Sequence, residues 1–430
     1  MIMAENSVRE FTVPERGQLR LKGLSWPEIS FLRRLEGESK LSLRLGEGEG
    51  DILVLATMHC GVVQAGSARI FIEPKVPVRN LLYLVESTYA LPNVSFYDQA
   101  NFARGRNFLE FLLHFFYSKV DQLVSGGLYR SYVPVTENVS LVRGRIDIPR
   151  TIMENFARPH RIVSEHDDYT DDVVENKIVR YTLERTRNLA TSEGLKRKLV
   201  KLLASFSDVE NPAALPQNIF ERLVYHRLNE HYKPVHELCR VLLTGIAIDI
   251  PAGPIGFRSF LVNMEQLFQE FLFATLKRSP HLADYQVVRQ SGSRIVWLRG
   301  TAERRDIHVV PDVRVRNAAD VLVVDAKYKR PLMGRAGRWI PVSPDVYQMM
   351  AYCVVHQCDG ALVYPKVETP EADLDEIYEV RGSDSLFKLK TLNLAEPLDG
   401  LKSTCEELCA NLRDFFERSH ASVDTRSLLA

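Results

Sequence analysis

Hydrophobic and polar positions follow different patterns in three successive parts of the chain. Over about the first hundred residues, segments such as LRLKGLSW and ILVLATMHCGVVQAGSARIFIEPKV alternate or run apolar between Gly and Ser turns, which is typical of strands. One helix is expected from about Pro27 to Leu35, because Ser25 and Glu28 have the spacing of a capping box. Residues 1–98 are therefore predicted to form a small β-rich domain.

The middle of the chain is chiefly helical in pattern. The segment NFLEFLLHFFYSKVDQLVSGGL repeats apolar residues at intervals of three and four and ends at a Gly-Gly pair. A strand-rich insert, YRSYVPVTENVSLVRGRIDI, follows, and further helices are expected over residues 171–189, 195–206 and 220–243. We therefore predict a mostly helical middle domain with a strand insert over residues 99–245.

Helix and strand patterns are mixed in the last part of the chain. NMEQLFQEFLFATLKR is an amphipathic helix, and the strands YQVVRQS, SRIVWLR, DIHVVPDVRVR and VLVVDAKYK follow it. A helix, PDVYQMMAYCVVHQ, a strand, GALVYP, and a final helix over residues 401–417 complete the pattern. This order predicts an α/β domain with a central mixed sheet over residues 246–430, and an α+β multidomain protein as a whole.

Composition and charge narrow the class of protein. The 430 residues are 45% hydrophobic and 26% charged, with equal numbers of basic and acidic side chains, which is ordinary for a globular protein. We expect no membrane association and no signal peptide, because no long apolar run is present and the first nine residues have no apolar core. Six scattered cysteines without zinc-finger spacing favour a cytoplasmic location.

The segment PDVRVRNAADVLVVDAKYKR, residues 311–330, carries the clearest chemical signal. Asp325 and Lys327 are two apart and share one face of a strand whose preceding residues are all apolar. A turn near residues 317–320 would pair this strand with the one after Asp312 and bring the two acids together. Neighbouring carboxylates do not both ionise cheaply, and Mg²⁺ prefers oxygen ligands and also binds phosphate. Lys327 would then orient or deprotonate a water for phosphodiester hydrolysis.

A plainer interpretation remains open from these residue types alone: an Asp–Lys ion pair at a strand end and an unrelated turn aspartate. Three further features favour chemistry. Gln348 and Tyr352 lie four apart on one helix face, Tyr328-Lys329-Arg330 could meet a phosphate backbone, and the earlier helix carries acids at Glu265 and Glu270.

The order of these features resembles the PD-(D/E)XK nuclease superfamily, and the Gln348/Tyr352 pair resembles its RecB-like branch. More narrowly, the chain is similar to McrC, the nuclease subunit family of the McrBC modification-dependent restriction systems. The segments that carry this resemblance occur in the expected order from about residue 60 to 365: GVVQAGSARIFIEPKV, LVRGRIDI, YTDDVVENKIVRYTL, RLNEHYKPVHELCRVLL, FLVNMEQLFQEFL, VDAKYK and DVYQMMAY.

The resemblance implies a restriction-endonuclease-like C-terminal domain that cuts DNA with Mg²⁺, for which Mn²⁺ can substitute. Asp312 and Asp325 would bind the metal, Lys327 would be the catalytic lysine, and Gln348 and Tyr352 would support the active site. The family often has Leu-Phe-Glu on the earlier helix, whereas this chain has Leu-Phe-Gln with the acid one position later. Glu270 and Glu265 are therefore alternative third metal ligands.

The resemblance also implies a partner, a McrB-like AAA+ GTPase that reads modified cytosine. The nuclease subunit docks through its N-terminal region and stimulates the GTPase. This division of labour fits the absence of a G-x-x-x-x-G-K-[ST] loop from the chain. Two other functions stay open: a non-catalytic adaptor that stimulates the motor, and a RecB-like repair nuclease.

Two charged clusters outside this site are also ambiguous. Residues 165–177 hold six acids, which suit either a second metal site or, more simply, the start of a helix. Arg143 and Arg145 lie on one strand face, where they would bind either phosphate or these acids.

Overall fold

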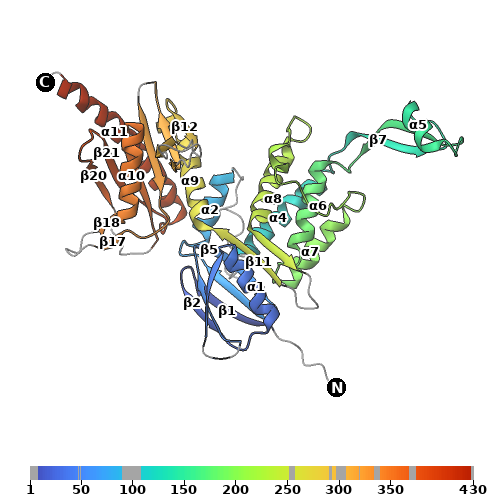
Figure 1. The fold of residues 1–430 in the computed structure, drawn as a ribbon, viewed down its shortest axis with the longest axis horizontal. Helices are drawn as coiled ribbons and strands as arrows, with labels where there is room; N and C mark the ends of the chain where they lie inside the picture. The colour runs from blue at the N-terminus through green and yellow to red at the C-terminus, as the bar shows by residue number, and fades with distance from the viewer. Residues whose placement is uncertain are drawn as a thin grey trace, which may run out of the picture. The chain divides into compact units, whose positions relative to one another are not determined.

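The computed structural model describes residues 8–46, 48, 50–89, 108–250, 257–289, 293–296, 307–318, 320–333, 339–367 and 374–427. The chain divides into two compact units (Figure 1). The first unit comprises Met1–Gln99, Ile250–Phe257 and Leu261–Ala430, and the second comprises Ala100–Asp249 and Arg258–Phe260. The predicted middle domain nearly coincides with the second unit, whereas the predicted first and last domains fall within one unit.

Two small sheets form the N-terminal part of the first unit. In one sheet, β1 (Arg9–Pro14) is parallel to β6 (Ala68–Glu73), which is antiparallel to β5 (His59–Ala65). The other sheet has the order β2-β4-β3, with β2 (Gln18–Leu21), β3 (Leu41–Leu45) and β4 (Ile52–Ala56) all antiparallel. The predicted strand-rich character of this part is confirmed.

Helix α1 (Trp26–Gly37) begins where the capping box predicted it. The backbone N–H of Ser25 donates to Glu28 Oε2 over 2.7 Å, and the other carboxylate oxygen of Glu28 accepts from the N–H of Ser67 over 2.7 Å. Glu28 therefore satisfies the helix start and ties it to the turn that precedes β6.

A six-stranded mixed sheet forms the centre of the C-terminal part. Its order is β12-β15-β16-β19-β21-β20. The bounds are β12 (Gln286–Arg289), β15 (Val313–Arg316), β16 (Val321–Ala326), β19 (Asp359–Lys366), β20 (Asp375–Glu379) and β21 (Leu386–Asn393). β16, β19 and β21 are parallel, and the other neighbours are antiparallel. The predicted mixed sheet is confirmed.

Helices and short strands surround this sheet. They are α9 (Met264–Arg278), β13 (Ser293–Val296), β14 (Ile307–Val309), β17 (Leu332–Met333), β18 (Trp339–Ile340), α10 (Ser343–His356) and α11 (Leu398–Ser427). Strand β11 (Phe257–Asn263), which precedes α9, belongs instead to the sheet of β1, β6 and β5. α9 packs against β12 and β16, α10 against β16 and β19, and α11 against β21. Residues Leu322 to Ala326 of β16 are all buried, so both faces of this strand are covered.

The N-terminal and C-terminal parts of the first unit share a buried interface. Helix α2 (Val78–Tyr89) packs against α9 and α11. The amide nitrogen of Asn80, a residue only 3% exposed, donates to the carbonyl oxygens of Leu394 and Glu396, both over 2.7 Å. Because a buried amide must keep its hydrogen bonds, this contact explains why the two predicted domains form one unit.

The second unit consists of helices and a long antiparallel arm. The helices are α4 (Phe108–Ser125), α6 (Val174–Thr186), α7 (Glu193–Ala204) and α8 (Lys233–Gly245), and β10 (Ile246–Ile250) follows them. The predicted helix over residues 220–243 is wrong over its first half. There the chain forms loops and short 3-10 turns, because the side chain of Asn229 accepts from the N–H of His226 and donates to the carbonyl oxygen of Val224.

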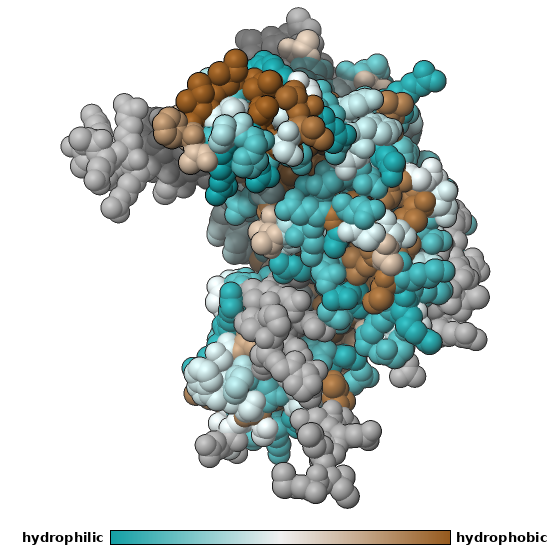
Figure 2. All heavy atoms as spheres, turned by 90° about the vertical axis from the view of Figure 1, so that its right-hand side faces the viewer, coloured by the Kyte–Doolittle hydropathy of each residue, from teal (hydrophilic) through white to brown (hydrophobic). Residues whose placement is uncertain are grey.

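The arm is an antiparallel ribbon with a short helix near its tip. β7 (Ser131–Val139) pairs with β9 (Ile162–Thr170) along nine residues, and β8 (Arg145–Ile146) and α5 (Ile148–Asn155) lie between them in the chain. Apolar side chains near the tip are more than half exposed: Leu141, Val142, Ile148, Ile152, Met153 and Phe156. Figure 2 faces this end of the molecule and shows a band of hydrophobic side chains there. Such a patch is typical of a surface that contacts another molecule.

No helix in the described parts of the chain combines the length and the apolar character that crossing a membrane requires.

The packing of α10 on the central sheet depends on a glycine. A Cβ atom at Gly360 of β19 would overlap Met349 Sδ and lie 3.0 Å from Cys353 Sγ, and both of these residues belong to α10. The absence of a side chain at Gly360 therefore sets how closely α10 approaches the strand.

We expect Gly360→Ala to lower the free energy of unfolding by about 1–3 kcal/mol, because the added methyl group forces α10 away from the sheet. Urea unfolding would measure the change. Gly37→Ala is the matched control, since a Cβ atom there meets nothing within 4 Å. Equal stability of the two variants would contradict the close packing of α10.

Candidate active site

The two acids of the site lie at the end of one hairpin. β15 and β16 are antiparallel, and Val313 pairs with Val324. The same register continued by one residue places Asp312 opposite Asp325. Asn317 closes the turn between the strands, because its Oδ1 accepts from the N–H of Asp320 over 2.7 Å. The predicted hairpin is confirmed.

The acid and the lysine share one face at the end of β16, as the alternation of strand side chains requires. Lys327 Nζ lies 2.6 Å from Asp325 Oδ2, and Asp325 is only 2% exposed. The N–H of Lys327 donates to the carbonyl oxygen of Val363 over 2.9 Å, which holds the residue to β19. The N–H of Ala326 donates to Asp312 Oδ2 over 2.8 Å, so the backbone fixes the second acid.

Burial and mutual repulsion change the acidity of this group. Burial, followed by the charge of Asp325, raises the pKa of Asp312 to about 7. Burial also raises the pKa of Asp325, although the Lys327 ammonium opposes that shift. Burial alone would lower the pKa of Lys327, but the charges of Asp325, Asp345 and Asp312 outweigh it and raise that pKa. Lys327 therefore carries a positive charge beside the carboxyl group of Asp325.

A chain of hydrogen bonds from α10 orients the lysine. Lys327 Nζ donates to Gln348 Oε1 over 2.7 Å, Gln348 Nε2 donates to Tyr352 Oη over 2.7 Å, and Tyr352 Oη donates to the carbonyl oxygen of Val310 over 3.0 Å. A carbonyl oxygen only accepts, so the tyrosine must donate to it and accept from the amide. This direction leaves the amide oxygen of Gln348 facing Lys327. The predicted Gln-x-x-x-Tyr pair thus contacts the predicted lysine.

Asp345 is a further buried acid near the site, and it was not predicted from the sequence. Asp345, at the start of α10, is 3% exposed. Its Oδ1 lies 2.7 Å from Lys329 Nζ, and its Oδ2 accepts from Tyr364 Oη over 2.5 Å. An acid in the first turn of a helix that follows a basic segment is the signal that could have identified it.

The basic segment after Lys327 differs in part from its prediction. Tyr328 is 5% exposed and Lys329 pairs with Asp345, so neither side chain forms an open surface for a phosphate backbone, whereas Arg330 is exposed. The tyrosine is buried because its ring packs against Phe268 of α9, with 5.9 Å between the ring centroids.

The two acids of α9 have different surroundings. Nη1 and Nη2 of Arg289 on β12 donate to the two carboxylate oxygens of Glu270, which makes a bidentate ion pair. The charge of Glu265 instead contributes to the raised pKa of Asp312. Glu265 therefore acts electrostatically on the acid pair, whereas Glu270 is engaged by an arginine.

The donor set at this site suits a divalent cation. Two carboxyl groups that repel each other lose that repulsion when a cation lies between them. In the described residues, no three His, Cys, Asp or Glu side chains gather closely enough to hold an ion by themselves. A metal bound by Asp312 and Asp325 would complete its shell with water or phosphate oxygens, as Mg²⁺ commonly does.

The other charged clusters resolve into ion pairs. Arg143 lies 3.6 Å from Asp168, and Arg145 lies 3.5 Å from Glu165. Asp172 lies 3.0 Å from Lys177. Of the two interpretations of Arg143 and Arg145, the structure thus shows contacts with the acids.

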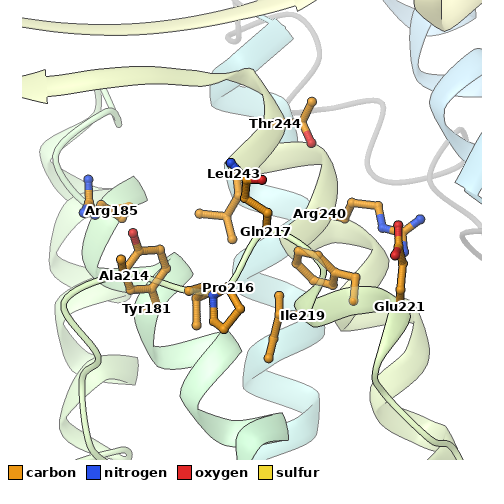
Figure 3. Close-up of a pocket in the computed structure, with 12 residues that line it drawn as sticks. Tyr181, Arg185, Ala214, Pro216, Gln217, Ile219, Glu221, Arg240, Leu243 and Thr244 are labelled. Carbon is orange, nitrogen blue, oxygen red and sulfur yellow. The ribbon is translucent and has the colours of Figure 1, made fainter.

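A cavity of about 490 Å³ lies in the second unit and shares no residue with the acid–lysine site. Figure 3 shows Tyr181 and Arg185 on one side of it and Arg240 and Glu221 on the other. The guanidinium of Arg185 already packs over the ring of Tyr181 at 5.0 Å. The cavity therefore has cationic and aromatic walls but no pair of acids that could take part in hydrolysis.

Comparisons with known proteins agree on one family. Residues 54–365 match the family model described as McrBC 5-methylcytosine restriction system component. The chain is 27% identical over 344 residues to the type IV methyl-directed restriction enzyme EcoKMcrBC of Escherichia coli strain K12, covering 75% of this chain and 94% of that protein. These matches define a protein of modification-dependent restriction. The chain belongs to the McrBC 5-methylcytosine restriction system component family, which confirms the resemblance noted in its sequence.

A solved structure shares the fold. It is a refined half-complex from a tetradecameric assembly of Thermococcus gammatolerans McrB AAA+ hexamers with bound McrC. The match has a TM-score of 0.63 and 17% identity, and it covers 94% of this chain and 100% of that chain.

The raised pKa of Asp312 predicts a pH-dependent stability in buffer that contains a chelator. The folded pKa of about 7 exceeds the ordinary 3.8, so stability falls as pH rises between these values. Asp312→Asn keeps an acceptor for the N–H of Ala326 but cannot ionise. We expect it to exceed wild type in free energy of unfolding by about 1–3 kcal/mol near pH 8, with the gap closing toward pH 4.

Urea unfolding at a series of pH values would measure this gap. Asp414→Asn, at an exposed position of α11, is the matched control and should show no such trend. A constant difference between Asp312→Asn and wild type across the pH range would contradict the raised pKa of Asp312.

Proposed function

We propose that this chain is the Mg²⁺-dependent DNA endonuclease subunit of a McrBC-like restriction complex. Its C-terminal part, residues 246–430, would be a PD-(D/E)XK nuclease domain that hydrolyses phosphodiester bonds. The observation that carries this proposal is the convergence of Asp312, Asp325 and Lys327 at the end of one hairpin, with Gln348 directed at the lysine. Family membership supports the restriction role.

Each residue has a role that follows from its contacts. Asp312 and Asp325 would hold Mg²⁺, which supplies charge stabilisation and an activated water when it is bound. Lys327 keeps its positive charge beside Asp325, so it suits stabilising charge on the scissile phosphate better than accepting a proton. Gln348 orients the Lys327 ammonium by accepting its hydrogen bond, and Tyr352 orients Gln348 by accepting a hydrogen bond from its amide nitrogen. Water would then attack phosphorus in line with the leaving oxygen, so that a new P–O bond forms as the old one breaks. The water's proton would pass to solvent, and the leaving oxygen would take up a proton from solvent.

The proposed partner is a McrB-like AAA+ GTPase that this chain stimulates and that selects modified DNA. The Thermococcus complex, whose fold this chain shares, contains McrB AAA+ hexamers with bound McrC. The exposed apolar tip of the arm adds a contact surface beyond the predicted docking domain at residues 1–98. The alternative is a non-catalytic adaptor that only stimulates the motor. The next experiment distinguishes this adaptor from a nuclease.

Asp325→Ala and Lys327→Ala should each lower DNA cleavage by at least about 100-fold, because each removes a charge from the reacting site. The assay uses methylated plasmid with Mg²⁺, GTP and the AAA+ partner. Stimulation of the partner's GTPase should persist in both variants, since neither residue lies in the N-terminal part.

Cleavage at the wild-type rate by both variants would refute the assigned site. Absence of cleavage by wild type itself, on several modified DNAs and with GTPase stimulation intact, would instead favour the adaptor. Cutting that requires a free DNA end would favour the repair nuclease.

Glu265→Gln should lower the cleavage rate and the affinity for Mn²⁺ more than Glu270→Gln does, by about tenfold in rate. The reason is that Glu265 acts on Asp312, whereas Arg289 occupies the carboxylate of Glu270. Cleavage assays and Mn²⁺ titration of the two variants form a matched pair. A larger loss in Glu270→Gln would assign the helix acid to that residue.

A further inference from the structure

A tight turn of the N-terminal part reaches the residue that follows the active-site lysine. The turn connects β1 and β2 and contains Glu15 and Arg16. The N–H of Glu15 donates to the carbonyl oxygen of Glu73 over 2.8 Å, and the N–H of Arg16 donates to that of Thr57 over 3.1 Å. The turn is therefore held to both sheets of this part by its backbone.

Arg16 adopts an unfavourable backbone conformation in this turn. Its φ angle is +57°, in the left-handed region that residues with side chains rarely occupy. Such a conformation persists where the surrounding contacts fix it, and it is common at functional sites. The side chain of Arg16 supplies such a contact with the C-terminal part.

Both neighbouring residues of the turn bind Tyr328. Arg16 Nη2 donates to the carbonyl oxygen of Tyr328 over 2.9 Å, and Tyr328 Oη donates to Glu15 Oε2 over 3.1 Å. Glu15 is 2% exposed, and its Oε2 also accepts from the N–H of Lys75 and the thiol of Cys60. The turn thus holds the main chain and the side chain of one residue at once.

The position of Tyr328 makes these contacts relevant to the lysine. The ladder between β16 and β19 ends at the pair Ala326 and Val363, and the bond from the N–H of Lys327 is the last one to the sheet. Beyond it, the sheet no longer fixes the path of the chain. Arg16 holds the carbonyl group of the following residue, Tyr328, so the chain after Lys327 is fixed by the N-terminal part.

Burial makes the two parts depend on each other. A buried carboxylate is costly unless it keeps its hydrogen bonds, so Glu15 favours the arrangement in which Tyr328 is in place. Burial, with the nearby Glu15 charge, raises the pKa of Tyr328, which keeps its hydroxyl a donor. The same arrangement sets the direction of the preceding backbone and of the Lys327 side chain.

We propose that Glu15 and Arg16 are positioning residues of the nuclease site, which act through Tyr328 on the placement of the Lys327 ammonium. This inference rests on the proposed function of the acid–lysine site. It assigns the N-terminal part a role in cleavage that is separate from partner docking. Neither residue touches the reacting atoms.

The test compares Arg16→Ala and Arg16→Lys with Arg20→Ala in the full chain with its AAA+ partner. Arg20 is exposed on β2 and is the matched control. We expect Arg16→Ala to lower the maximal cleavage rate about tenfold, because a misplaced charge stabilises the transition state less well. The half-saturating DNA concentration, the stimulation of GTPase and the melting temperature should stay near wild type. Arg16→Lys should restore the rate to within about threefold, since an ammonium can donate to the same carbonyl oxygen.

A second readout does not depend on cleavage. Lys327 can be labelled with an amine-reactive acetylating reagent and quantified by peptide mass spectrometry, with the exposed Lys201 as internal reference. We expect Arg16→Ala and Tyr328→Phe to raise the labelling of Lys327 several-fold. Tyr328→Phe removes only the hydroxyl group, so it tests the inference even if Arg16→Ala unfolds.

Three outcomes would overturn the inference. Wild-type cleavage and labelling in both Arg16→Ala and Tyr328→Phe would show that the turn does not position the lysine. Parallel losses of cleavage, GTPase stimulation and melting temperature would show a structural role alone. Full cleavage by Asp325→Ala would refute the proposed active site instead, while the labelling result would still report on the contact.

Discussion

The antiparallel register between β15 and β16 is the constraint on which the candidate site depends. Because strand side chains alternate with a period of two, a slip of one residue would turn a whole set of side chains to the other face. Buried apolar side chains on both strands fix the register, and the Asn317–Asp320 turn closes it. This pairing places Asp312 opposite Asp325. The two negative charges are therefore close together, and the site needs positive charge to offset them.

The need to offset these negative charges explains which side chains surround Asp312 and Asp325. A buried carboxyl group beside a partly buried one requires positive charge, and Lys327 supplies part of it from 2.6 Å away from Asp325. A lysine side chain is flexible, so its placement needs partners on several sides. Gln348 provides one partner from α10, and the packing of α10 depends in turn on the missing side chain of Gly360. A glycine near the start of β19 therefore contributes to the geometry of the lysine that follows the neighbouring strand, β16.

The two units divide the remaining tasks. The first unit combines the N-terminal sheets with the six-stranded sheet, and the buried side chains of Asn80 and Glu15 bind across that interface. The N-terminal part is therefore structurally continuous with the acid–lysine site. The second unit carries the arm, whose apolar tip side chains stay exposed among the residues that the structure describes. This arrangement fits a protein that contacts a motor and acts on DNA with different parts of one chain.

The sequence by itself determined the features that arise from local order. Helix starts, strand ends, the acid-x-Lys segment and the Gln-x-x-x-Tyr spacing depend on neighbouring residues and on the periods of helix and strand, so they were predictable. Tertiary structure alone decided the pairings. It directed Arg289 to Glu270, buried Tyr328 against Glu15 and Phe268, and bound Asn229 to the distant Glu175. These contacts join residues that are far apart in the sequence and that are buried against each other only in the folded chain. No repeating pattern of residues along the chain predicts which of them will meet.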